Sequence, residues 1–341
     1  MQWHGRACAA AFAVSHRAPV VHLQEHRPMP KITESLRELI AAGSSLQPIN
    51  VAVCHPCSEI ALRGAIEAAE ARLITPMLVG PLDRIRSIAG LAGLDLRGCE
   101  LIDTPHSHAS AERAVALCRS GQCEALMKGS LHTDEMMHEV MRTDTGLRTA
   151  RRISHVYLME VTSYPKMLMI TDAAINIYPT LDDKQHIVQN AIDLALALGI
   201  TLPKVAILSA VETVDAKILS TIDAAALCKM ADRGQITGAI LDGPLAFDTA
   251  INLQAAQVKG LISAVAGSAD ILVVPDLESG NMLAKQLEYL ANAKAAGIVL
   301  GARVPIILTS RSDSTETRLA SCAVAVRLAH LNQIAKETVH A

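Results

Sequence analysis

The sequence predicts an α/β protein made of two α/β domains, each with a mostly parallel sheet covered by helices, and an active-site cleft between them. From Pro30 onward, short apolar runs alternate with amphipathic stretches, and little else separates them. Half of the residues are hydrophobic but only 2% are aromatic, which is typical of helices that cover a buried parallel sheet. The length of 341 residues allows two domains of ordinary size.

The first half of the chain alternates predicted helices with predicted strands. Short apolar runs indicate buried strands, and apolar positions that repeat every three or four residues indicate helices. Ser58 is placed to cap one helix, and Pro81 is placed to open the next. The predicted elements are, in order, helix 31–42, strand 50–54, helix 58–72, strand 75–79, a helix from residue 81, strand 100–103, helix 107–119, strand 124–128 and helix 133–141.

The second half repeats this alternation. Tyr164-Pro165 separates two apolar runs, which predicts a hairpin between them. The long amphipathic stretches that follow predict helices, and the apolar runs between them predict strands. The predicted elements are, in order, strands 155–161 and 167–171, helix 181–198, strand 204–209, helix 215–232, strands 239–242 and 271–274, helix 283–291, strands 297–300 and 304–308, and a helix over 319–328.

The segment from Arg148 to Ser154 is polar and basic between strong elements, and it predicts a crossing point between domains. We expect one domain over 29–150 plus 304–341 and a second over 151–303, because the last strand and helix are expected to return to the first domain. Residues 1–28 contain a short, interrupted apolar stretch without the layout of a signal peptide. We expect them to be a disordered extension, or an over-extended start.

Composition narrows the classes of function. The net charge is −3 and no large basic block occurs, which argues against a nucleic-acid-binding protein. No apolar run reaches the roughly 18 residues that a membrane helix needs. The eight cysteines are scattered, which favours reduced thiols and a cytoplasmic location over a disulfide framework.

Thr309 to Ser314 form the most informative segment of the chain. They follow an apolar run that predicts a buried strand, and they precede the last predicted helix. A hydroxyl, a guanidinium and a carboxylate therefore meet where a strand ends and a helix begins, which is where open α/β sheets bind ligands. Unpaired backbone N–H groups at the helix start favour an anion. We expect a phosphate or carboxylate site with a base beside it.

Polar residues follow four other predicted strands. Each such segment on its own indicates only a turn. Together they predict a cleft, because the carboxyl ends of parallel strands share one edge of the sheet. The segments are 128–130, 171–176, 242–248 and 275–281. The motifs of α/β-hydrolases, P-loop enzymes and dinucleotide-binding proteins are missing.

Several of these segments together resemble the phosphate acetyl/butyryltransferase family. The resemblance runs from about Lys31 to the end of the chain. The motifs that carry it are Leu126-Met-Lys-Gly-Ser130, Gly146-Leu-Arg148 with Ile153-Ser-His155, Ile170-Thr-Asp-Ala-Ala-Ile-Asn176, Leu241-Asp-Gly-Pro-Leu-Ala-Phe-Asp248, Ala269-Asp-Ile-Leu-Val-Val-Pro-Asp276 with Gly280-Asn281, and Thr309-Ser-Arg-Ser-Asp-Ser314.

The resemblance implies reversible acyl transfer between coenzyme A and inorganic phosphate in a cleft between two domains, usually of a homodimer. Coenzyme A is then a substrate, and neither a cofactor nor a metal is expected. Ser310 and Arg311 match the family's serine–arginine pair, with Arg311 expected on the acyl phosphate and Ser310 near the thiol. Asp313 or Glu316 is expected to accept the thiol proton, with no choice made between them. The residues expected to bind substrate are Lys128, Gly129, Ser130, Arg142, Arg148, Thr171, Asp172, Asn176, Asp276, Gly280 and Asn281.

The chain departs from the acetyl branch of the family at three places. Thr317 occupies the position of that branch's aspartate, and Leu287 stands where that branch often has arginine. The branch's substrate-binding arginine between Met137 and Glu139 is also missing, so Arg142, Arg148 or Lys128 is expected to substitute. These departures make the active-site segments similar to the butyryltransferase branch. Acetyl is the first expectation for the acyl group, and butyryl is the alternative.

Two further readings remain open at this point. A non-catalytic regulator that keeps the fold is one, although Ser310, Arg311 and Asp313 argue against it. A metal-dependent decarboxylating dehydrogenase of related fold is the other, and it requires aspartates suited to a divalent metal together with a nicotinamide site. The sequence does not contain that pattern.

Overall fold

The computed structural model describes residues 35–308 and 313–340, with side chains described up to Ile334. All of them belong to one compact unit, residues 31–341. The strands are β1 Ile49–Cys54, β2 Ile74–Gly80, β3 Glu100–Asp103, β4 Ala125–Lys128, β5 Ser154–Glu160, β6 Leu168–Thr171, β7 Lys204–Leu208, β8 Ile240–Leu245, β9 Ile271–Val273, β10 Lys294–Leu300 and β11 Ile306–Ile307.

These strands form one sheet in the order β3-β2-β1-β4-β11-β10-β5-β6-β9-β7-β8. Neighbouring strands are parallel except around β10 and β5. There β10 is antiparallel to both β11 and β5, and β5 is antiparallel to β6. The predicted α/β class with a mostly parallel sheet is therefore confirmed. The division into domains over 29–150 plus 304–341 and 151–303 stays a prediction.

The helices lie between the strands, largely as predicted. They are α1 Leu36–Ser44, α2 Glu59–Glu70, α3 Leu82–Ala92, α4 Ser107–Arg119, α5 Thr133–Met141, α6 Leu181–Ala197, α7 Leu219–Asp232, α8 Phe247–Ile251, α9 Leu253–Val258, α10 Leu277–Leu290 and α11 Thr315–His340. The side chain of Ser58 caps α2 by accepting a hydrogen bond from the backbone N–H of Ala61.

The boundaries of four helices differ from prediction, and two short helices were missed. The first is α1, which begins at Leu36 because the Ser35 side chain caps it, and which ends at Ser44 instead of residue 42. The start of α10 is set by Asp276, whose side chain caps it by accepting from the N–H of Ser279 at 2.8 Å. The Ser279-Gly280-Asn281 stretch has low helix propensity, so the pattern alone placed the start later. The start of α7 is delayed because Asp215 holds a turn with the N–H of Ile218. The last helix, α11, extends at both ends beyond the apolar repeat that predicted it over 319–328. The two missed helices, α8 and α9, are too short to show an apolar repeat.

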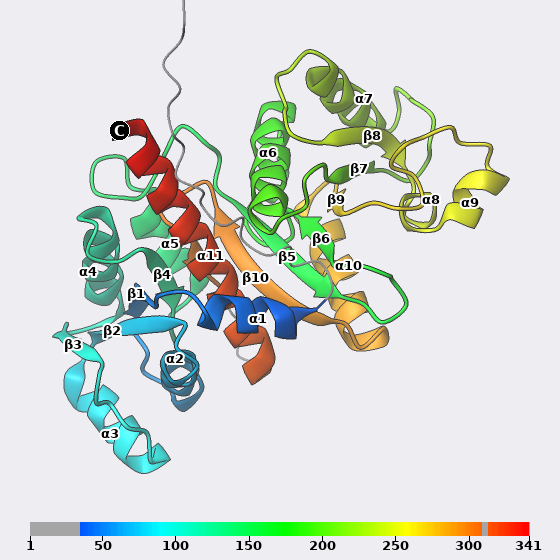
Figure 1. Cartoon of the computed structure of the whole chain (residues 1–341). Coiled ribbons are helices and arrows are strands. Elements are labelled where there is room, and N and C mark those ends of the chain that lie inside the picture. The colour runs from blue at the N-terminus through cyan, green and yellow to red at the C-terminus, as the bar shows by residue number, and fades with distance from the viewer. Residues whose placement is uncertain (1–34, 309–312, 341) are drawn as a thin grey trace, which may run out of the picture. The chain divides into compact units, whose positions relative to one another are not determined.

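Three hydrophobic clusters make up the described interior. Core A packs α1, α2, α3, α6, α7 and α11 onto the sheet and includes Val53, Leu62, Leu158, Ile192, Ile298 and Val324. Core B packs α4 and α5 and includes Cys54, Leu126, Leu131, Met136, Ile153, Val299 and Ile306. Core C includes Met159, Ile170, Val274 and Ala295, with α10 against it. In Figure 1, α11 (red) crosses α1 (blue), and these two helices contact each other.

Candidate active site

The two faces of the sheet are covered differently. Successive residues of a strand point to opposite faces, so Val53 of β1 lies in core A while Cys54 lies in core B. On β10, Ile298 lies in core A, whereas Val299 lies in core B and Ala295 in core C. Core A is therefore continuous across one face. The other face changes from core B to core C at β10 and β5.

Three residues mark this change, and we call the surface that they form the junction: His155 and Tyr157 on β5 and Gly297 on β10. Tyr157 pairs directly with Gly297 in the sheet. A side chain at Gly297 would place its Cβ 2.9 Å from Nε2 of His155 and 3.2 Å from the carbonyl oxygen of Leu308. The glycine therefore lets the His155 ring lie close to the end of β11.

One row of paired residues crosses the sheet at this level. In order, it contains Met127, Ile307, Ile298, Val156 and Thr171. Lys128 follows Met127, and Asp172 follows Thr171, but β4 and β6 run in opposite directions. The expectation that all the strand ends share one edge is therefore wrong. The antiparallel β10 and β5 instead bring ends from both halves of the sheet to one central row.

The segment Lys128-Gly129-Ser130 is held against the end of β1. The N–H of Gly129 donates to the carbonyl of Cys54 at 2.9 Å, and the N–H of Ser130 donates to that of His55 at 3.0 Å. The hydroxyl of Ser130 also donates to the carbonyl of His55, at 2.9 Å. A Cβ on Gly129 would collide with the carbonyl oxygen of Cys54. Only glycine fits this approach, while Lys128 is half-buried at the strand end.

The segment from Thr171 to Asn176 is organised by the carboxylate of Asp172. Its oxygens accept hydrogen bonds from the backbone N–H groups of Ala174, Ile175 and Asn176 and from the Asn176 side chain. Burial raises the pKa of Asp172, and these donors oppose that rise. The hydroxyl of Thr171 donates to the carbonyl of His155 at 2.8 Å. Most of the polar groups of this segment are therefore already engaged in shaping the loop.

The segment from Asp276 to Asn281 lies directly against this loop. A Cβ on Gly280 would lie 3.0 Å from the carbonyl oxygen of Asp172 and 3.1 Å from Cα of Ala173. The side-chain amide of Asn281 donates to the carbonyl of Ala173 at 3.3 Å. Gly280 and Asn281 therefore position the Asp172 loop, and Asp276 positions the start of α10.

Core B joins these segments to the remaining ones. Leu131 follows Ser130, Ile175 belongs to the Asp172 loop, and Leu308 follows β11, and all three pack into core B. Three of the five predicted strand-end segments, 128–130, 171–176 and 275–281, are thus connected through described contacts. Leu308 directly precedes the fourth segment, whose residues 309–312 lie outside the described part of the chain. The fifth, residues 242–248, includes the end of β8, an edge strand that β9 and β7 separate from β6.

The acidic residues near the start of α11 have different surroundings. Glu316 pairs with Lys294 at 3.0 Å and with Arg37 at 3.2 Å. The hydrogen bond from Lys294 is the largest influence on Glu316 and lowers its pKa. The charge of Asp313 instead reaches Tyr157, whose pKa is raised mainly by burial and further by Asp313. It also adds a small part to the raised pKa of Lys285, which the hydrogen bond to Glu288 raises against the effect of burial. Ser310 and Arg311 lie outside the described residues.

The two arginines proposed as substitutes lie at the end of α5 and beyond it. Arg142 pairs with Glu139 at 3.2 Å. The backbone of Arg148 forms an isolated antiparallel β-bridge with Ala302. Its guanidinium is 3.5 Å from the hydroxyl of Thr143. Arg148 and Arg152 line a cavity of about 190 Å³. Because Nε of Arg152 donates to Oδ1 of Asn176 at 2.7 Å, this cavity borders the Asp172 loop.

Sequence reasoning missed His155 as a site residue and did not consider Tyr157 or Lys285. His155 is 1% exposed, and its ring lies edge-on to Tyr157 with centroids 4.3 Å apart. Its Nδ1 is buried without a hydrogen-bond partner. Burial lowers its pKa to about 3, so the imidazole is neutral. The sequence signal that could have identified it is a histidine in a largely apolar predicted strand, 155–161.

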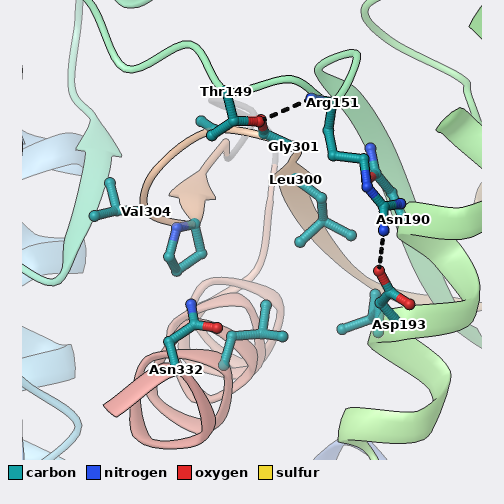
Figure 2. A pocket seen from close by; sticks show the side chains of 12 residues that line it. Thr149, Arg151, Asn190, Asp193, Leu300, Gly301, Val304 and Asn332 are labelled. Carbon is teal, nitrogen blue, oxygen red and sulfur yellow. Dashed lines mark hydrogen bonds and ion pairs between the residues drawn. The ribbon is translucent and has the colours of Figure 1, made fainter. Parts of the chain in front are cut away.

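A separate cavity of about 330 Å³ lies between α6, α11 and the connection from β10 to β11 (Figure 2). Arg151 pairs with Asp193 on one wall at 3.3 Å, and Thr149 and Asn332 contribute polar groups elsewhere. Its described lining consists of residues other than those predicted to bind substrate. The cavity therefore lies apart from the junction.

Within the described residues, no group of three or more histidine, cysteine, aspartate or glutamate side chains is arranged to hold a metal ion. No described helix is long and apolar enough to cross a membrane.

The sequence matches the family model described as "Phosphate acetyl/butaryl transferase" over residues 109–326. The chain is 65% identical to a phosphate acetyltransferase of Rhizobium meliloti over 84% of its own length and 91% of that protein's. It is 40% identical to a phosphate butyryltransferase of Clostridium acetobutylicum over 87% of its own length and 98% of that protein's. Among solved structures, it resembles a branched-chain phosphotransacylase from Enterococcus faecalis V583, with a TM-score of 0.73 and 31% identity over 83% of this chain and 99% of that one.

Proposed function

The chain belongs to the phosphate acetyl/butyryltransferase family, and we propose that it transfers a short acyl group reversibly between coenzyme A and inorganic phosphate. In one direction, acyl-CoA and phosphate give an acyl phosphate and CoA. Acetyl is the first acyl group to test and butyryl the second. Coenzyme A serves as a substrate in this scheme, and neither a further cofactor nor a metal is assigned a role.

The observation that carries the site assignment is the packing of these segments on one another beside the junction. Two segments expected to bind substrate, which follow β4 and β6, pack through core B with Leu308 at the end of β11, and the segment after β9 lies against the Asp172 loop. Bringing two substrates together in a fixed geometry removes much of the entropic barrier to a bimolecular reaction. We assign the reacting groups of both substrates to this surface.

The chemistry requires a proton acceptor and a group that holds the phosphate. The thiolate, not the thiol, attacks the carbonyl of the acyl phosphate, so a carboxylate near the thiol must accept its proton. A guanidinium can bind the phosphate through two hydrogen bonds and offset the charge that develops in the transition state. We assign Arg311 to the phosphate and Ser310 to the thiol side, with Lys128 as a second cation.

Asp313 is the better candidate for the proton acceptor. Glu316 is neutralised by Lys294 and Arg37, and its lowered pKa makes it a weaker base. The charge of Asp313 acts on Tyr157 of the junction, adding to the rise in pKa that burial causes there. We therefore assign the thiol proton to Asp313 and a structural role to Glu316, in which it ties α11 to β10.

We also propose that the enzyme works in the cytoplasm as a homodimer, within acetate metabolism. The seven described cysteines are free thiols, which is consistent with a reducing compartment. Light scattering coupled to size-exclusion chromatography tests the assembly, and a mass of one protomer across the working concentration range would contradict it.

The test of the proposed function is CoA-dependent thioester formation, with acetyl phosphate and butyryl phosphate compared side by side. Arg311→Ala serves as the control. Activity with either acyl phosphate that is lost in Arg311→Ala supports the proposal, and the ratio of kcat/KM values identifies the acyl group. A folded protein that forms no thioester from either would contradict it.

A further inference from the structure

Arg318 lies on the first turn of α11, and its side chain is only 12% exposed. Its guanidinium makes two kinds of contact. Nη1 donates to the carbonyl oxygen of Asp313 at 2.6 Å. Nη2 pairs with Oε2 of Glu67 on α2 at 3.1 Å and donates to the hydroxyl of Thr315 at 3.1 Å. Arg318 therefore connects Asp313, two residues before α11, to a different helix.

Gly64 makes room for this arrangement. It is a buried glycine in the interior of α2, one turn before Glu67. A Cβ at this position would lie 3.0 Å from both Cδ and Nε of Arg318. Glycine in a helix interior costs about 1 kcal/mol relative to alanine, and here its absence of a side chain lets the arginine stem lie flat on α2.

The place of Asp313 in the chain gives this contact a consequence. Its carbonyl accepts a hydrogen bond from Arg318, and its carboxylate belongs to the same residue, whose charge reaches Tyr157 of the junction. Arg318 therefore holds the backbone of the residue to which we assign the thiol proton. A fixed carbonyl limits the rotation of the peptide and hence the directions that this carboxylate can take.

We propose that Arg318, held by Glu67 and seated on Gly64, is a positioning residue that aims the carboxylate of Asp313 into the active site. The role rests on the proposed acyl transfer, in which Asp313 accepts the thiol proton. Arg318 touches no substrate in this scheme and acts only through Asp313.

The geometry requires a guanidinium. Its planar fork presents separate donors, so one arm can hold the Asp313 carbonyl while the other holds the Glu67 carboxylate. A lysine has one ammonium group on a flexible stem and cannot reproduce both contacts at the same angles. Arg318→Lys therefore keeps the charge but loses the alignment.

The test compares kcat and KM for thioester formation in four variants: Arg318→Lys, Arg318→Ala, Glu67→Gln and Gly64→Ala. Misplacing a catalytic group by about 1 Å can cost about 100-fold in rate. We expect kcat of Arg318→Lys to fall about 10- to 100-fold while KM changes little, because substrate contacts remain. Gly64→Ala is expected to lower kcat without lowering the melting temperature, since alanine favours the helix. Added guanidinium, kept below denaturing concentrations, is expected to restore part of the activity of Arg318→Ala.

Arg327 offers a matched control on the same helix. It is 3% exposed and donates to the carbonyl of Ala197 at 2.6 Å, away from Asp313. Arg327→Lys and Arg327→Ala are expected to lose stability without a selective loss of kcat and without rescue by guanidinium. A wild-type kcat in Arg318→Lys, or equal behaviour of the Arg318 and Arg327 variants, would overturn the positioning role alone. An inactive wild type would overturn the proposed function and this role with it.

Discussion

The side-chain amide of Asn176 donates to Oδ2 of Asp172 at 2.6 Å and to the carbonyl of Ile153 at 2.9 Å. One buried amide thus joins the loop after β6 to the residue before β5, beside the junction. Asp172 and Asn176 were both expected to bind substrate, and both also make several hydrogen bonds within the protein. Their first role in the structure is to shape the loop that packs Ile175 into core B.

Replacing Asn176 by alanine is expected to lower both stability and activity. Leaving buried partners unsatisfied costs about 1–3 kcal/mol, and a displaced loop is expected to lower kcat about tenfold. Asn190 on α6 provides the control, because it is as buried as Asn176. Its side-chain amide donates to the Arg152 carbonyl and to the Ser154 hydroxyl, on the face of the sheet that core A covers. Chemical denaturation and kinetics on both alanine variants check this. Equal losses of activity in both would contradict the assignment.

The two carboxylates near the start of α11 are expected to differ in mutagenesis. General acid–base catalysis contributes about 10²- to 10⁴-fold, so Asp313→Asn is expected to lower kcat by that factor. Glu316→Gln loses only the ion pairs with Lys294 and Arg37 and is expected to keep its kcat within about threefold. The pH–rate profile of Asp313→Asn should also lose its acidic limb. The opposite ranking of the two variants would assign the proton transfer to Glu316.

The burial of neutral His155 predicts how stability depends on pH. Burial lowers its pKa from 6.5 to about 3, so between these values the unfolded chain binds one proton more than the folded chain. Stability therefore falls as pH decreases below 6.5, by about 1.4 kcal/mol per unit from this group.

Denaturation at pH 7 and pH 5 measures this effect. The loss of stability on acidification is expected to be about 2 kcal/mol smaller in His155→Gln than in the wild type. His138→Gln is the control, because His138 is exposed on α5. If His155→Gln and the wild type lose the same stability on acidification, His155 is not buried as a neutral group.

Two helix glycines are expected to respond in opposite ways to alanine. Gly90 on α3 faces open space, so Gly90→Ala is expected to stabilise the protein by about 0.5–1 kcal/mol. Gly280 on α10 would place a Cβ 2.7 Å from Cγ2 of Val274 and 3.0 Å from the carbonyl oxygen of Asp172. Gly280→Ala is expected to destabilise by about 1–3 kcal/mol and to lower activity. A neutral Gly280→Ala would show that α10 does not press on the Asp172 loop.

Most of the fold could be predicted from the sequence, because its local signals agree with its tertiary structure. The apolar run of β1 and the Ser58 cap of α2 are examples. The change from parallel to antiparallel pairing at β10 and β5 could be predicted only in part. The direction of a strand within a sheet depends on pairing partners that are distant in the chain. Tyr164-Pro165 indicated the hairpin of β5 and β6, but nothing local indicated that β11 pairs with β4 and β10.

The candidate site could be predicted as segments but not as contacts. Polar residues after apolar runs located the loops at Lys128, Asp172 and Asp276. Three of the partners of Asp172 are backbone N–H groups of its own loop, and such bonds carry no sequence pattern. The different surroundings of Asp313 and Glu316 depend on Lys294, Arg37 and Tyr157, which are far away in the chain. Ser310 and Arg311 remain predictions.

The most direct test of the central claim is to follow acetyl-CoA and inorganic phosphate with the wild-type enzyme by ³¹P NMR. Acyl transfer predicts that a resonance of acetyl phosphate grows as inorganic phosphate declines, with one free thiol released for each molecule formed. Adding CoA should then reverse the change. Release of thiol without acetyl phosphate would identify hydrolysis instead, and would contradict transfer to phosphate.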